Sequence, residues 1–200
     1  MNQTNIDALI AQAVKAKPRQ FLTEKILRSV LIQESGLVST FERSDKQYRA
    51  NMQKAMQITG KPEAELLELV TRSDGKIAKF RCEPSIWNSA RVSKIAYPAR
   101  FYYSCSWGLG QVLGVNLMGK SSPANARSTI LGFSLNEPYQ CLYAANSFEQ
   151  ALVGAYLSPS ITKKDIKSLV FYSYVRYNSG TYLSKDLSAQ KRAQEVVSRL

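Results

Sequence analysis

Residues 21–38 read FLTEKILRSVLIQESGLV, and this stretch decides the fold because its apolar residues repeat with a helical period that runs into a carboxylate. Apolar side chains three or four residues apart share one face of a helix. In this stretch they are Leu22, Ile26, Leu27, Val30, Leu31 and Leu37. Glu34 follows Val30 by four residues, so the period places it on the apolar face at the C-terminal end of the helix. We expect the helix to stop at Gly36.

A carboxylic acid in that position is a candidate proton donor. Burial disfavours the charged form of a carboxyl group, and the negative end of the helix dipole acts in the same direction. Such a group can stay protonated near neutral pH and donate its proton to a substrate. We therefore expect Glu34 to be a buried general acid; the alternative is a surface residue at a fraying helix end.

Composition favours one domain and an anionic partner. The chain has 200 residues, of which 44% are hydrophobic, enough for a single core. Its formal net charge is +12, from 27 Lys and Arg against 15 Asp and Glu, so it should be attracted to polyanions. The basic residues are spread out, without the basic block that is typical of nucleic-acid arms. Charge alone does not choose between nucleic acid, anionic lipid and the bacterial envelope.

The absence of histidine excludes several kinds of site. Triads that use imidazole as base, HExxH zinc sites and Cys/His finger sites all need a side chain that this chain lacks. Acid or base chemistry must then use a carboxylate, lysine, tyrosine or cysteine. We expect neither a metal ion nor a cofactor.

Cysteine spacing and the N-terminal sequence give further expectations. Cys82, Cys105 and Cys141 are far apart and lack CxxC spacing, so we expect reduced core thiols; one disulfide with a spare thiol is the alternative, and no spacing selects a pair. The apolar run Ala8 to Val14 is interrupted by Gln12 and lacks a basic region before it, which indicates neither a signal peptide nor a membrane span.

Helical patterns cover most of the chain and predict a mainly α fold. Besides the helix in residues 21–38, we expect a short amphipathic helix at about 4–14. Further helices are expected at 44–59, 62–75, 107–118, 138–158, 162–177 and 188–200. The two helices at about 44–72 look like an insertion in a single domain of residues 1–200. The only convincing extended stretch is Ile77 to Trp87, where we expect a small hairpin or a lone strand.

Three short motifs stand at predicted helix ends and carry a resemblance. They are Glu34-Ser35, Ser106-Trp107-Gly108-Leu109-Gly110-Gln111 and Tyr177-Asn178-Ser179-Gly180. Their order resembles the soluble lytic transglycosylase domain, a relative of goose-type lysozyme with a lysozyme-like α+β fold. The second motif is similar to a GLMQ pattern with Gly110 in place of Met, and the third to an AYNxG pattern with Arg176 in place of Ala.

The resemblance implies an activity and a set of site residues. Such enzymes cleave peptidoglycan between N-acetylmuramic acid and N-acetylglucosamine and form 1,6-anhydro products, with the glutamate of the first motif, here Glu34, as catalytic acid and base. The resemblance further implies substrate contacts from Ser35, Gln111, Tyr177 and Asn178, with Gly108 and Gly180 as the motif glycines.

A fourth segment bears on whether a second carboxylate takes part. RCEPSIW, residues 81–87, is similar to an RxEP-aromatic segment of phage-type members and adds Glu83 to the candidate substrate contacts. Hydrolytic glycosidases use two carboxylates, and Glu83 ranks first as the second one, ahead of Glu42 and Asp45. The alternative role for Glu83 is a structural salt bridge with an arginine.

Three functional hypotheses follow. The first is a peptidoglycan lytic transglycosylase encoded by a bacteriophage, either an endolysin or a virion protein, because no signal peptide is evident. It would stay in the virion or the host cytoplasm until it acts at the cell wall, with peptidoglycan as its substrate and the anionic envelope or virion proteins as further partners. The second is a hydrolytic muramidase of the same fold. The third is a basic binding or structural module; nucleic acid is the less favoured partner.

Overall fold

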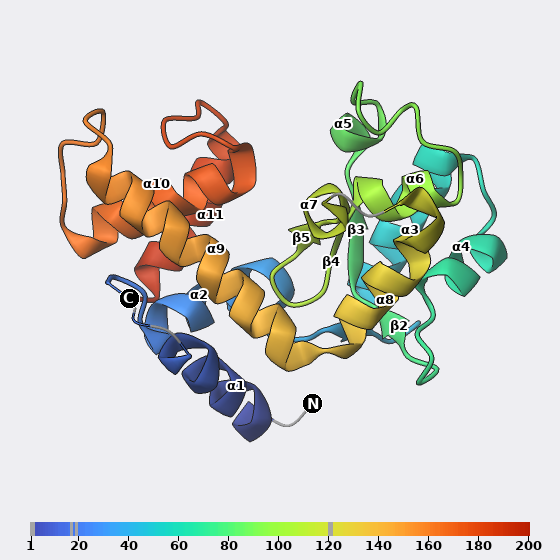
Figure 1. Cartoon of the computed structure of the whole chain (residues 1–200), viewed down its shortest axis with the longest axis horizontal. Coiled ribbons are helices and arrows are strands. Elements are labelled where there is room, and N and C mark those ends of the chain that lie inside the picture. Colours follow the sequence, from blue (N-terminus) through green and yellow to red (C-terminus); the bar gives the residue numbers. More distant parts are fainter. Residues whose placement is uncertain (1–2, 17, 19, 120–121) are drawn as a thin grey trace. The chain divides into compact units, whose positions relative to one another are not determined.

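The computed structural model describes residues 3–16, 18, 20–119 and 122–200 (Figure 1). It is 62% helical with 7% strand, so the predicted mainly α fold with a short β excursion is confirmed. No described helix is long and apolar enough to cross a membrane. The chain forms two compact units: unit 1 is Met1–Leu37 with Cys141–Leu200, and unit 2 is Val38–Gln140. Whether these two units form the single domain that we expect for residues 1–200 stays a prediction.

The regular secondary structure in the described part of unit 1 is all helical. It contains α1 (Gln3–Lys15), α2 (Glu24–Ser35), α10 (Ile166–Ser179), α11 (Leu187–Ser198) and all but the first turn of α9 (Glu137–Leu157). Helix α11 packs against both α10 and α2, and α1 packs against α2 (Figure 1). The fully buried side chains of this core include Leu27, Val30, Leu31, Phe148, Leu152, Val170 and Tyr174.

Helix α2 is the organising helix that the sequence predicts. Thr23 caps its start, because the Thr23 side chain accepts a hydrogen bond from the Ile26 amide at 3.3 Å. Gly36 ends it in the left-handed conformation, with φ of 64°, and donates its N–H to the Ile32 carbonyl. The expected apolar face and its stop at Gly36 are both confirmed.

A carboxylate from α9 holds the segment that leads into α2. The backbone N–H groups of Gln20, Phe21 and Leu22 donate to the Glu149 carboxylate at 2.7, 3.3 and 2.9 Å. Hydrogen bonds to an ionised acceptor are stronger than neutral ones. Glu149 therefore fixes where α2 begins within unit 1.

Unit 2 combines short helices with two small antiparallel sheets. Its helices are α3 (Lys46–Thr59), α4 (Glu63–Val70), α5 (Pro84–Trp87), α6 (Ala99–Ser104), α7 (Gly114–Met118), η1 (Pro123–Asn125) and α8 (Ala126–Leu135). One sheet pairs β1 (Thr40–Phe41) with β2 (Ile77–Ala78). The other has the order β3 (Phe80–Cys82), β4 (Cys105–Trp107), β5 (Val112–Leu113). Helices α3 and α4 occupy the stretch that the sequence assigns to an insertion.

The structure corrects two local predictions in unit 2. The helix expected over 107–118 exists only from Gly114 onward, because Gly108 and Gln111 take left-handed φ values of 69° and 46° in the turn that joins β4 to β5. The extended stretch expected up to Trp87 ends at Cys82, since Pro84 starts the short helix α5.

A disulfide joins Cys82 and Cys105, which lie directly opposite each other in the β3–β4 pair. The expectation of three reduced thiols is therefore wrong for these two residues, while Cys141 is buried in α9 outside this bond. Phe80 and Trp107, the pair two positions along the same ladder, are fully buried with Phe101. The disulfide thus fastens the strand pair beside the aromatic core of unit 2.

Reducing this disulfide should lower the free energy of unfolding by about 3 kcal/mol, because it closes a loop with a sequence separation of 23 residues in the unfolded chain. Urea unfolding with and without dithiothreitol measures the effect. The Cys82→Ser/Cys105→Ser double variant is the control and should not respond to the reductant. An unchanged wild-type midpoint under reducing conditions would contradict the prediction.

Candidate functional site

Glu34 lies in the last turn of α2, which belongs to unit 1. Its side chain is only 2% exposed, and among the described residues it is the one buried carboxylic acid. Its position on the apolar face of α2 explains this burial, since the neighbouring positions on that face, Val30 and Leu31, are fully buried. The predicted burial of Glu34 is therefore confirmed.

Three side chains from α10 and α11 donate hydrogen bonds to the Glu34 carboxylate. The Tyr174 hydroxyl donates to Oε1. The Asn178 amide donates to the same oxygen at 3.5 Å and to the Tyr174 carbonyl at 3.2 Å. Arg192 Nη2 lies 3.0 Å from both Oε1 and Oε2. Oε1 of Glu34 thus accepts hydrogen bonds from a phenol and an amide, and the guanidinium contacts both Oε1 and Oε2.

The charges of this cluster reinforce one another. Burial raises the pKa of Tyr174, and the neighbouring Glu34 charge raises it further, so the phenol stays a hydrogen-bond donor. Burial by itself lowers the pKa of Arg192, but Glu34 and Tyr174 outweigh it and the net shift is upward. A charged guanidinium in contact with both oxygens stabilises the ionised carboxylate. The expectation from the sequence, which considered burial and the helix dipole, did not include this partner.

Helix α11 brings Arg192 to the site through an apolar face and polar contacts to α2. Ala189, Ala193 and Val196 are buried. Glu195 accepts a hydrogen bond from Gln33 Nε2 at 2.8 Å, and Arg199 donates to Gln33 Oε1 at 2.9 Å. Because Gln33 precedes Glu34 in α2, these bonds set the register of α11 beside the site.

The other predicted residues of unit 1 lie in the same region of the fold. The Tyr177 ring stacks on Tyr174 with centroids 6.3 Å apart. Ser35 is buried, and its hydroxyl donates to the Leu31 carbonyl at 3.0 Å. Gly180 ends α10 with φ of 81°. The first and third motifs therefore come together in unit 1.

Sequence reasoning missed Tyr174 and Arg192. Tyr174 precedes Asn178 by four residues, so the helical period of α10 could have placed the two on one face beside Glu34. For Arg192 the sequence holds no such signal, because the contact spans 158 residues and depends on how α11 docks.

The second motif forms a compact polar turn in unit 2. Gln111 is buried; its Oε1 accepts from the Ser106 hydroxyl at 3.1 Å, and its Nε2 donates to the Gly108 carbonyl at 2.8 Å. A Cβ at Gly108 would lie 2.1 Å from Gln140 Oε1, which accepts from the Leu109 amide at 2.7 Å. Glycine is thus required at position 108 by both space and φ, and both glutamines shape the turn.

Glu83, also in unit 2, accepts a hydrogen bond from Arg81 Nε at 2.8 Å, and the two side chains are 26% and 32% exposed. This is the structural salt bridge that the sequence offered as the alternative role.

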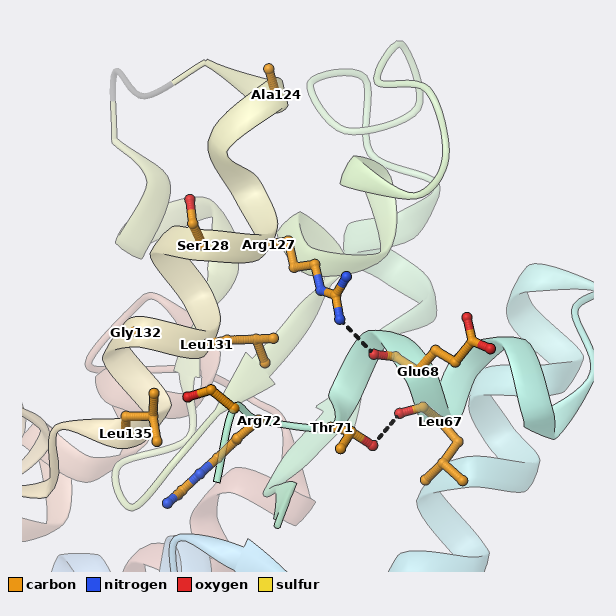
Figure 2. Close-up of a pocket in the computed structure, with 11 residues that line it drawn as sticks. Leu67, Glu68, Thr71, Arg72, Ala124, Arg127, Ser128, Leu131, Gly132 and Leu135 are labelled. Carbon is orange, nitrogen blue, oxygen red and sulfur yellow. Dashed lines mark hydrogen bonds between the residues drawn. The ribbon is translucent and has the colours of Figure 1, made fainter. Parts of the chain in front are cut away.

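A large hollow in unit 2 lies elsewhere. It has a volume of about 940 Å³ and is lined from α4 and α8, with Arg127 donating to the Glu68 carbonyl across it at 3.2 Å (Figure 2). None of the sequence-predicted site residues lines it. Within the described ranges, no group of three or more His, Cys, Asp or Glu side chains could hold a metal ion.

No family model, curated protein or solved structure matches this chain. What the site can do therefore follows from its own chemistry.

The ion pair between Glu34 and Arg192 should show a coupling of about 1 to 3 kcal/mol in a double-mutant cycle, because it is buried and hydrogen-bonded. Urea unfolding of Glu34→Gln, Arg192→Gln and the double variant measures it. The matched control is the pair Asp7–Arg28, also 3.0 Å apart but 48% and 41% exposed, whose coupling should stay below about 1 kcal/mol. Equal couplings for the two pairs would refute the prediction.

Proposed function

We propose that this protein cleaves peptidoglycan glycan strands between N-acetylmuramic acid and N-acetylglucosamine as a lytic transglycosylase, with Glu34 as both acid and base. One observation carries the proposal. The buried glutamate of the first motif accepts a hydrogen bond from Asn178 of the third motif, although the two are 144 residues apart. Two short segments chosen from the sequence for this chemistry thus meet around one carboxyl group.

The first step is proton transfer to the leaving oxygen. The Glu34 carboxyl group, in its protonated form, gives its proton to the glycosidic oxygen while the bond from that oxygen to C1 of the muramic acid breaks. Positive charge develops on the sugar ring as in other glycosidases. The Tyr174 hydroxyl and the Asn178 amide hold the carboxyl group in place during this transfer.

The second step closes the ring and restores the acid. The 6-hydroxyl of the same muramic acid attacks C1 and forms the new bond, and its proton passes to the Glu34 carboxylate. No water is consumed, and the product carries a 1,6-anhydro ring. One carboxyl group therefore serves both steps.

The remaining acids of unit 1 that have assigned contacts are engaged in other ways. Glu149 holds the backbone before α2, and Glu195 accepts a hydrogen bond from Gln33. Asp165 and Asp186 cap the starts of α10 and α11, while Asp7 and Glu24 pair with Arg28 and Lys15. A hydrolase of the inverting kind would need a second carboxylate about 6.5 to 9.5 Å from the first to position water. The engagement of these acids favours the single-carboxylate mechanism.

The place of action is part of the same proposal. A net charge of +12 favours long-range attraction to the anionic polymers of the bacterial wall and envelope. We propose that the protein is delivered there by a bacteriophage, as an endolysin or within the virion.

Digestion of purified peptidoglycan should release muropeptides that end in 1,6-anhydromuramic acid, because the 6-hydroxyl rather than water attacks C1. Mass spectrometry separates these products from ordinary reducing ends, which are 18 mass units heavier, about the mass of one water added by hydrolysis. If all products carried ordinary reducing ends, the hydrolytic muramidase would replace the transglycosylase as the proposed function.

Glu34→Gln should lower the rate of wall solubilisation by about 10²- to 10⁴-fold, because the amide cannot transfer a proton. The control is Glu24→Gln in the same helix, whose side chain is 50% exposed and which should retain the wild-type rate. Circular dichroism checks that both variants fold. Full activity in folded Glu34→Gln, or none in the wild type on any wall preparation, would leave the basic binding module as the better hypothesis.

A further inference from the structure

We infer that Arg192 is a positioning residue that stabilises the charge left on Glu34 when its proton is donated, and that this contact sets the upper pH limit of catalysis. This inference rests on the proposed role of Glu34 as the acid. Its basis is geometric: Arg192 Nη2 lies 3.0 Å from each carboxylate oxygen, and its side chain is only 23% exposed.

The contact has opposite effects on the two halves of proton donation. A guanidinium beside a carboxylate disfavours the protonated form, so fewer molecules hold a proton to donate at a given pH. As the proton leaves, negative charge develops on the two oxygens, and the same guanidinium stabilises that charge without reorganisation. Arg192 therefore stabilises the carboxylate form that proton donation produces.

The helix that carries Arg192 is anchored by contacts other than the bond to Glu34. Asp186 caps α11 by accepting hydrogen bonds from the Ser188 and Ala189 amides at 2.9 and 3.2 Å. At the other end, the bonds of Glu195 and Arg199 to Gln33 fix the helix against α2. The guanidinium also lies 6.0 Å from the centroid of the Tyr174 ring. The backbone position from which Arg192 reaches Glu34 is thus fixed by the docking of α11.

Within the described part of the chain, the side chains with assigned hydrogen bonds to the Glu34 carboxyl come from two helices. From α10 they are the Tyr174 phenol and the Asn178 amide, and from α11 the Arg192 guanidinium. Asn178 does not titrate. Tyr174 stays protonated because burial and the Glu34 charge raise its pKa. Arg192 is therefore the one nearby charge among these groups whose removal changes the balance between the two forms of Glu34.

The test is the pH–rate profile of wall solubilisation for wild type, Arg192→Lys and Arg192→Gln. Activity requires protonated Glu34 and falls on the alkaline side as that proton is lost. Without the guanidinium, this alkaline limb should move up by about 1 to 3 pH units. Arg192→Lys keeps a positive charge and should move it less. The matched control is Lys191→Gln, which removes an exposed cation from the same helix and whose limb should overlay the wild type.

A second readout separates the inference from the proposed function. Side-chain carboxyl ¹³C shifts, with the Glu34 signal assigned by its absence in Glu34→Gln, follow the protonation of this group without any substrate. The titration midpoint should rise in Arg192→Gln and rise less in Arg192→Lys. An unmoved midpoint, or a limb that stays in place while the rate drops equally at every pH, would overturn the role of Arg192. Moved midpoints in a protein that releases no muropeptides would instead overturn the proposed function.

Discussion

A carboxylate buried at the C-terminal end of a helix is the constraint on which unit 1 depends. Removing an ionised carboxylate from water is costly, and the dipole of α2 adds to the cost because its negative end lies at Glu34. Apolar packing alone cannot compensate. A cation and hydrogen-bond donors must be supplied from elsewhere, and here they come from α10 and α11. Meeting this requirement draws three helices together around one side chain.

In unit 2, buried polar groups without a charge also need partners from elsewhere in the fold. Its turn at residues 108–111 leaves backbone groups inside the fold, and buried amide groups must be paired. Gln140 and Gln111 pair them: Gln140 accepts from the Leu109 amide and donates to the Phe133 and Ser134 carbonyls, while Gln111 donates to the Gly108 carbonyl. The disulfide between β3 and β4 then secures the strand that leads into this turn.

The sequence predicted what local periodicity controls. The apolar face of α2, its stop at Gly36, the burial of Glu34 and the helices α3, α4 and α10 all follow from spacing and capping residues. The turn at Gly108 was misread as a helix because left-handed φ values at Gly108 and Gln111 leave no trace in the apolar pattern. The Cys82–Cys105 pair was missed because it depends on the register of a strand that no pattern predicted. Arg192 was missed because docking of α11 is a tertiary event.

Under the proposed mechanism, the opposing influences on Glu34 serve a purpose. A single carboxyl group that first gives a proton and then takes one back cannot be optimised for either task alone. Burial and the helix end favour its neutral form, which the first step uses. Arg192, Tyr174 and Asn178 favour its charged form, which the second step uses. In enzymes with two carboxylates, separate environments divide these roles. Here one environment has to combine them, and a cation held by a separately anchored helix is a means of setting the balance.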